Sequence, residues 1–185
     1  MRDKREKVLN KIDEKPASSM QKNYANKLGI NLPENATQSD AKALIARDLD
    51  NDEQASNSLL EYARRKGMLC SDYIGSKALH NQLFDNLSGR DKVSFFCFCV
   101  YKFYWNDGNE DLENHPKKEL FEAFGERFEK DSYFKASMEE YLGEELVAFG
   151  KSKKIVNGIE KIVYGGSAYT RAHNEAYEYL KNSAN

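Results

Sequence analysis

The chain has few of the residues that build disulfide frameworks and metal centres, and it has no long apolar run. Its 185 residues include three cysteines and three histidines, and no apolar stretch approaches the roughly 20 residues that a helix needs to cross a bilayer. No apolar segment of the kind found in a secretory leader follows the charged start of the chain. An odd number of cysteines indicates reduced thiols. We therefore expect a cytoplasmic protein without membrane contact.

Catalytic patterns are also scarce. None of the histidines is spaced from another histidine, or from a cysteine, as a metal site requires. Cys97 and Cys99 have one residue between them, and on a helix their side chains diverge by roughly 200°. The sequence Gly165-Gly166-Ser167 lacks the Lys-Ser/Thr ending of a phosphate-binding loop. These observations predict a protein that is not an enzyme and that holds no metal or cofactor.

The composition is that of a globular chain with unevenly distributed charge. Apolar residues make up 40% of the sequence and aromatic residues 12%, which excludes a chain disordered by composition. The net charge is −2, but residues 107–145 carry five basic and thirteen acidic side chains, while the flanking segments are mildly basic. This asymmetry indicates a directed electrostatic surface. A pair of solvated amphipathic helices would give the same pattern.

Residues 18–49 carry the most informative local pattern. Ser18 and Gln21 have the spacing of a capping box, which marks the start of a helix. Gly29 fits the left-handed position that closes a helix, and Pro33 favours extended geometry after it. Thr37 provides the cap of a second helix. The segment therefore predicts a helix, an extended loop and a second helix.

A second copy of this unit follows from two short matches. Residues 24–29 and 62–67 share the pattern Tyr-Ala-x-basic-x-Gly, and Lys-Ala-Leu occurs at both 42–44 and 77–79. The first pair lies 38 positions apart and the second 35, which predicts a second loop that is three residues shorter. Such repeats are typical of stacked helical pairs. Two matches in helices rich in alanine and lysine also arise by chance, so a duplication of 18–49 in 58–87 stays open.

The remaining elements complete a mainly α fold. Residues 91–105 are apolar on nearly every face and follow a cap-like tetrad, which favours a central buried helix, although a strand also suits their content. Asn157-Gly158 between two β-branched runs predicts a hairpin over 153–164. We expect two domains: residues 1–50, with a charged N-terminal helix and the helix–extended-loop–helix module, and residues 51–185, a helical domain with one small β-hairpin.

Basic side chains at helix ends and before the hairpin are candidates for contacts with nucleic-acid phosphates. Lysine and arginine also suit helix C-termini through the helix dipole, so a structural role explains some of them equally well. The candidates are Lys22, Lys27, Lys42, Arg47, Arg64, Arg65, Lys66, Lys151, Lys153 and Lys154.

A cluster of carboxylates forms the second candidate site. Glutamates at i, i+1, i+5 and i+6 lie within the acidic segment and form a candidate partner-binding face. The same spacing would serve a divalent cation or acid–base chemistry, and a solvated acidic face explains it as well. The residues are Glu139, Glu140, Glu144 and Glu145.

The stretch from Pro16 to Thr37, about an eighth of the chain, resembles a segment that recurs in phage and mobile-element proteins of Firmicutes. It is similar in outline to SAP-type and other helix–extended-loop–helix DNA-binding modules. In the second helix of such a module, Lys42 and Arg47 match the basic positions. The resemblance implies a binding module rather than a catalytic one.

As a small, tyrosine-rich helical protein with an acidic block, the whole chain looks like a type II-A anti-CRISPR protein, an inhibitor of Cas9. This resemblance implies a non-enzymatic phage-type inhibitor that binds a bacterial defence protein in the cytoplasm of the host bacterial cell. The glutamate face would then lie where DNA phosphates bind. The alternative is a DNA-binding accessory protein of a phage or mobile element, with double-stranded DNA as its partner. The sequence leaves open whether the chain forms a homo-oligomer.

Overall fold

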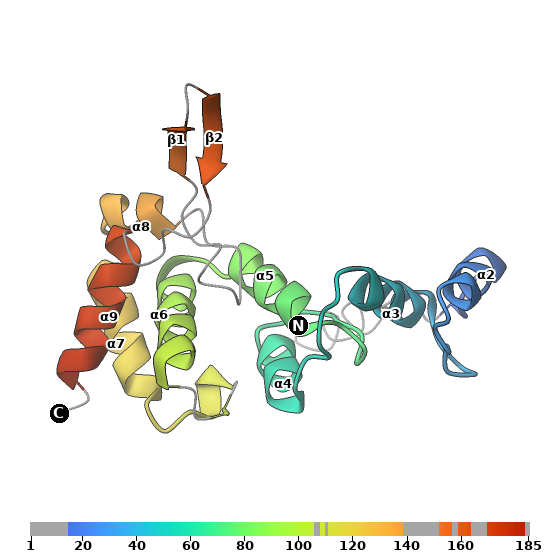
Figure 1. Ribbon diagram of the computed structural model, residues 1–185. Coiled ribbons are helices and arrows are strands. Elements are labelled where there is room, and N and C mark those ends of the chain that lie inside the picture. Colours follow the sequence, from blue (N-terminus) through green and yellow to red (C-terminus); the bar gives the residue numbers. More distant parts are fainter. Residues whose placement is uncertain are drawn as a thin grey trace. The chain divides into compact units, whose positions relative to one another are not determined.

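The computed structural model describes residues 15–105, 108–109, 111–138, 152–156, 159–163 and 170–183 (Figure 1). Within these ranges the chain forms eight α-helices, one short 3-10 helix and one antiparallel pair of strands. The prediction of a mainly α protein is therefore confirmed. The chain divides into two compact units, Met1–Leu79 and His80–Asn185. The division at residue 50 that the sequence favours stays a prediction.

The first unit begins with two helices that start side by side. Helix α2 spans Ser19–Lys27 and helix α3 spans Gln38–Leu49. Main-chain hydrogen bonds fix this arrangement: the N–H of Ala17 donates to the carbonyl of Ala36 at 2.8 Å, and the N–H of Gln38 donates to that of Lys15 at 2.9 Å. The loop between the helices therefore returns to the point where α2 begins.

Local capping starts each of these helices. The Ser18 hydroxyl accepts the N–H of Gln21 and the Gln21 side chain accepts the N–H of Ser18, while Thr37 and Asp40 make the same exchange at α3. Gly29 follows α2 with φ +76°, a left-handed conformation that a side chain would oppose.

Helices α4 (Asn57–Arg65) and α5 (Ser76–Asn86) repeat this pattern. Most main-chain hydrogen bonds that shape the first loop have a counterpart 38 positions further along the chain. The N–H of Ala55 donates to the carbonyl of Ile74 at 2.9 Å, and the N–H of Ser76 donates to that of Glu53 at 2.7 Å. Gly67 has φ +81°, as Gly29 has +76°. Residues 15–49 and 53–87 are thus two copies of one structural unit.

The hydrogen bonds correct the register expected from the sequence. The Lys-Ala-Leu match between 42–44 and 77–79 predicts a shorter second loop, but the loops are equal in length because the offset stays at 38 from residues 17 and 55 to residues 38 and 76. Only six residues are identical in this register: Ala17, Ser18, Tyr24, Ala25, Gly29 and Leu49 with their counterparts. The Lys-Ala-Leu match is a coincidence of composition.

The two copies start their second helices in different ways. Gly75 stands where the first copy has Thr37, so α5 has no capping side chain at this position. The Asp52 carboxylate replaces it, because its two oxygens accept the N–H groups of Lys77 and Ala78, both at 3.1 Å. A Cβ at Gly75 would overlap this carboxylate. Asp52 therefore fills the space that a threonine would need.

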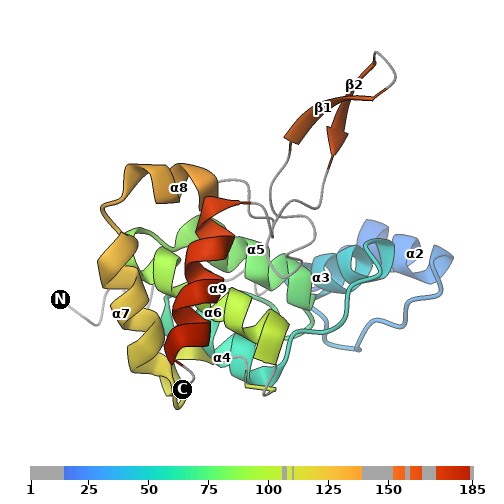
Figure 2. The same cartoon turned by 60° about the vertical axis from the view of Figure 1, so that its left-hand side comes forward.

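The second unit is built around α6 (Gly89–Trp105), which packs against α7 (Lys118–Phe128) and α9 (Arg171–Ser183) (Figures 1 and 2). The 3-10 helix η1 (Leu112–Asn114) precedes α7, and α8 (Ser132–Met138) packs on α9. Nine consecutive residues of α6, from Val93 to Tyr101, are buried. The stretch over 91–105 is thus a helix, but its last turn is not buried all round.

An aromatic core fills the space between these helices. Phe124 lies 5.6 Å from Phe134 and 4.7 Å from Phe128 between ring centroids, and Phe96 contacts Phe134 edge-on. Gly125 allows α7 to approach α6 closely, because a Cβ there would overlap the Ser94 hydroxyl. Ring contacts of this kind add to the stabilisation from burial.

Strands β1 (Ser152–Val156) and β2 (Ile159–Val163) pair antiparallel, with Ser152 opposite Val163 and Val156 opposite Ile159. The two residues between them, which the sequence predicts to form the turn, lie outside the described residues.

Candidate nucleic-acid interface

Three of the predicted phosphate-binding lysines are exposed on the first copy. Lys22 and Lys27 lie on α2 and Lys42 lies on α3. Their ammonium groups have no hydrogen-bond or ion-pair partner among the described residues. We use the name lysine face for the exposed surface of the first copy that carries these three lysines. Tyr24, which is 45% exposed, lies two positions after Lys22 and therefore on another side of α2.

In the second copy, positions that correspond to those of the lysine face are buried. Lys22 corresponds to Leu60, which is 3% exposed, and Lys42 corresponds to His80, which is 1% exposed. Tyr24 corresponds to Tyr62, whose exposure is also 1%. The same positions are therefore buried in the second copy and open to solvent in the first. Neither lysine is needed for the helix–loop–helix fold, because the second copy forms this fold with Leu60 and His80 at these positions.

Apolar side chains accompany the lysines on the first copy. Met20 is 81% exposed and Leu49 is 56% exposed, whereas the counterpart of Leu49 in the second copy, Leu87, is 8% exposed. Met20 and Tyr24 lie four residues apart on one face of α2, and Tyr24 is exposed where its counterpart Tyr62 is buried. Only the comparison of the two copies reveals this difference, and that comparison needs the correct register.

The other predicted phosphate-binding side chains that the structure describes, Arg47, Arg64, Arg65 and Lys66, contact neighbouring groups. Arg47 donates to the Gln54 side chain at 3.0 Å and to the carbonyl of Tyr73 at 3.4 Å. Arg64 pairs with Asp72, Arg65 lies 3.8 Å from Glu61, and the Lys66 ammonium lies 5.6 Å from the centroid of the Tyr62 ring. Their assignment to nucleic acid stays a prediction. The structure does not bring them together with the lysine face in one site.

The remaining predicted site residues have no described side chains. The backbone of Lys153 and Lys154 belongs to β1, and nothing is described of Lys151. The predicted acidic face, Glu139, Glu140, Glu144 and Glu145, lies outside the described residues.

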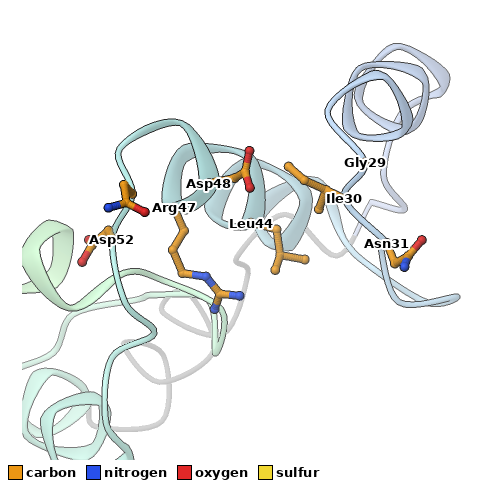
Figure 3. A pocket seen from close by; sticks show the side chains of 8 residues that line it. Gly29, Ile30, Asn31, Leu44, Arg47, Asp48 and Asp52 are labelled. Atoms are coloured by element: carbon orange, nitrogen blue, oxygen red, sulfur yellow. The ribbon is translucent and has the colours of Figure 1, made fainter.

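A pocket of about 380 Å³ lies between α3 and the loop that follows α2 (Figure 3). Leu44 and Arg47 project into it from α3, and Ile30 lies across from them on the loop after α2. Asp48 and Asp52 also line the pocket. Its mixed charge does not fit a phosphate as well as the unpaired lysines do, so we do not include it in the interface.

Other kinds of site have little support in the described ranges. No group of three or more His, Cys, Asp or Glu side chains in these ranges is arranged to hold a metal ion. No helix that the structure describes is both long and apolar enough to span a membrane. We found no match between this chain and protein-family models, curated proteins or solved structures.

Proposed function

We propose that the chain is a non-enzymatic binding protein of a phage or mobile element, and that its lysine face contacts the phosphates of duplex DNA. One observation carries the proposal: Lys22 and Lys42 are exposed, and have no partner among the residues that the structure describes, at positions that are buried in the second copy. The first copy has a binding surface where the second copy has a packing surface.

The chemistry of an unpaired lysine favours phosphate. Lysine presents a compact, strongly hydrated positive charge, and its binding to DNA releases condensed counterions. Contacts of this kind position a protein on the duplex without reading its sequence. Residues 15–49 carry five basic and three acidic side chains, so their net charge is small. We therefore expect sequence-independent binding with a Kd on the order of 10⁻⁴ to 10⁻⁶ M at physiological salt.

The double variant Lys22→Gln/Lys42→Gln tests this proposal. We expect the logarithm of the duplex affinity to depend less steeply on the logarithm of the salt concentration, by roughly 2 in slope, because each lost phosphate contact removes about 0.9. The measurement is the fluorescence anisotropy of a labelled duplex titrated with wild-type and variant chains at several salt concentrations.

The matched control is Lys130→Gln/Lys135→Gln, which removes the same charge from two exposed lysines of the second unit. This variant should keep the wild-type slope. If the two double variants weaken binding equally, net charge explains the effect and the lysine face is not the site. If the wild-type chain does not bind duplex DNA at low salt, the proposal is wrong.

We also propose a second candidate, a Cas9 inhibitor that binds through the acidic segment 107–145. Several described carboxylates in this segment have cationic partners: Glu113 lies 2.6 Å from Lys118 and Glu126 lies 2.8 Å from Arg90. Asp131 pairs with Arg171 at 2.7 Å. The acidic face at 139–145 would supply further negative charge to mimic DNA phosphates.

A cleavage assay with purified Cas9, guide and target DNA tests this second candidate. The wild-type chain should inhibit cleavage, and the variant Glu139→Gln/Glu140→Gln/Glu144→Gln/Glu145→Gln should inhibit it much less. Uninhibited cleavage at a large molar excess of wild-type chain, for several Cas9 orthologues, would falsify the Cas9 assignment. The same chain could still bind DNA through its lysine face, so the two assays decide separate questions.

A further inference from the structure

Two aromatic side chains are exposed on the last turn of α6. Phe103 is 53% exposed and Tyr104 is 42% exposed, although the preceding residues of the helix from Val93 to Tyr101 are buried. Their ring centroids lie 5.0 Å apart and their planes meet at 80°. The helix therefore ends in two large rings that present different faces to solvent.

A row of rings behind them holds this surface in place. The Tyr104 hydroxyl and His173 Nε2 share a hydrogen bond of 3.0 Å. His173 and Tyr177 are nearly parallel, with an angle of 6° between their planes, and Tyr177 is in turn stacked on Trp105 at 23°. Trp105 stacks on Tyr101 at 15°. The exposed rings are thus fixed by α9 as well as by their own helix.

Lysines lie at both ends of the row. The Lys117 ammonium is 4.9 Å from the centroid of the Tyr101 ring, and the Lys181 ammonium is 6.0 Å from that of Tyr177. Both lysines are exposed. Burial lowers the pKa of His173, although the nearby Asn174 side chain acts in the opposite direction. His173 thus favours its neutral form, so the positive charge at this surface comes from the lysines.

We propose that the surface formed by Phe103 and Tyr104, together with Lys117 and Lys181 at the ring row behind it, binds single-stranded nucleic acid. Unpaired bases stack on exposed aromatic rings, and flanking lysines neutralise the phosphates that connect these bases. Tyr177 connects the two parts of that chemistry, because its ring centroid lies 4.8 Å from that of Tyr104 and the Lys181 ammonium lies over the Tyr177 ring. The surface belongs to the second unit and does not rest on the lysine face, so it adds a contact with unpaired strands to the proposed contact with duplex.

The arrangement favours a nucleic acid over an apolar protein partner for two reasons. An apolar protein surface that covered the rings and the lysines would offer the ammonium groups no anionic partner. Burial of an unpaired ammonium group is costly. A single strand supplies both an apolar base face and a phosphate charge. Because any base can stack, we expect tolerance of sequence and a strong dependence on salt.

Trp105 provides a direct probe, because it is the single tryptophan of the chain and stacks within the row. The experiment titrates the full chain with an oligothymidylate of about 16 nucleotides at low salt and follows the tryptophan fluorescence. Saturable quenching that weakens as salt is added is the expected result. No binding by this criterion and by anisotropy of a labelled strand would overturn the proposal and leave the surface to a protein partner.

Three variants separate ring stacking from general apolar contact. Tyr104→Ala and Phe103→Leu should each weaken binding at least about fivefold, because the loss of one stacked base is worth that much. Phe103→Leu keeps an apolar side chain but no ring, so wild-type affinity in this variant would contradict stacking. Tyr133→Ala is the control, since Tyr133 is 78% exposed on α8 and should not affect binding. Circular dichroism verifies that each variant folds.

The variant Lys22→Gln/Lys42→Gln distinguishes this proposal from the preceding one. It should weaken duplex binding, with the smaller salt slope given above, and keep the quenching of Trp105 by oligothymidylate. If the quenching disappears as well, single strands bind at the lysine face and the aromatic surface is not the site. If duplex binding is absent in the wild-type chain but quenching occurs, the proposed duplex function fails and the single-strand site stands.

Discussion

Replacement of Gly125 by alanine should destabilise the protein by about 1–3 kcal/mol, the usual cost of adding a methyl group to a well-packed contact. The new Cβ would overlap the Ser94 hydroxyl and lie 2.8 Å from the main-chain carbonyl of Arg90. The carbonyl belongs to α6 and cannot turn away as a side chain can, so α6 and α7 would have to separate. Urea denaturation followed by circular dichroism measures the change in unfolding free energy.

The control for this prediction is Ala123→Gly on the same helix. Ala123 is exposed, so the substitution should cost about 1 kcal/mol, the ordinary difference in helix propensity between alanine and glycine. Alanine is thus favourable at 123 and unfavourable at 125. Ser94→Ala should partly rescue Gly125→Ala, because it removes one of the overlapping atoms. If Gly125→Ala stabilises the protein, the close approach of the two helices is wrong.

The variant Asp52→Ala should cost about 1–2 kcal/mol, as is typical for the loss of a helix cap. It leaves the N–H groups of Lys77 and Ala78 without the carboxylate that accepts them. Gly75→Thr alone should also destabilise the protein, because the new side chain would overlap the Asp52 carboxylate.

The double variant Asp52→Ala/Gly75→Thr tests whether a threonine at position 75 can replace the Asp52 carboxylate as the cap of α5. It gives the second copy the arrangement of the first, in which the Thr37 hydroxyl accepts the N–H of Asp40 at 3.1 Å. We expect the double variant to be clearly more stable than the sum of the two single changes predicts. Purely additive free energies of unfolding would show that the two residues do not replace each other.

Local chemistry explains which parts of the first copy can be predicted from sequence. Ser18 with Gln21, and Thr37 with Asp40, lie three positions apart, so the pairs that start α2 and α3 are visible in the sequence. The mainly α fold follows from the same kind of information. The exposed lysines are visible only as cations, because sequence does not show which of them already have partners.

The missed features depend on residues far apart in the chain. Asp52 caps a helix 25 positions away, and nothing near Gly75 indicates it. The register of the second copy was missed because its hydrogen bonds involve main-chain atoms, which leave little trace in side-chain identity. The apolar run over 91–105 does not reveal that Phe103 and Tyr104 are exposed. Which side of this helix is covered depends on α9, which lies far along the chain at residues 171–183.

The different caps of the two copies would also disfavour one wrong pairing while the chain folds. Proteins with repeated units misassemble when a segment of one unit pairs with the matching segment of the other. Residues 53–55 would form the same main-chain hydrogen bonds with the segment at 36–38 that they form at 74–76. In that wrong pairing, however, the Asp52 carboxylate would meet the side chain of Thr37 where it now meets the bare backbone of Gly75. This steric overlap would therefore disfavour the pairing of residues 53–55 with 36–38, although the backbones of the two copies are alike.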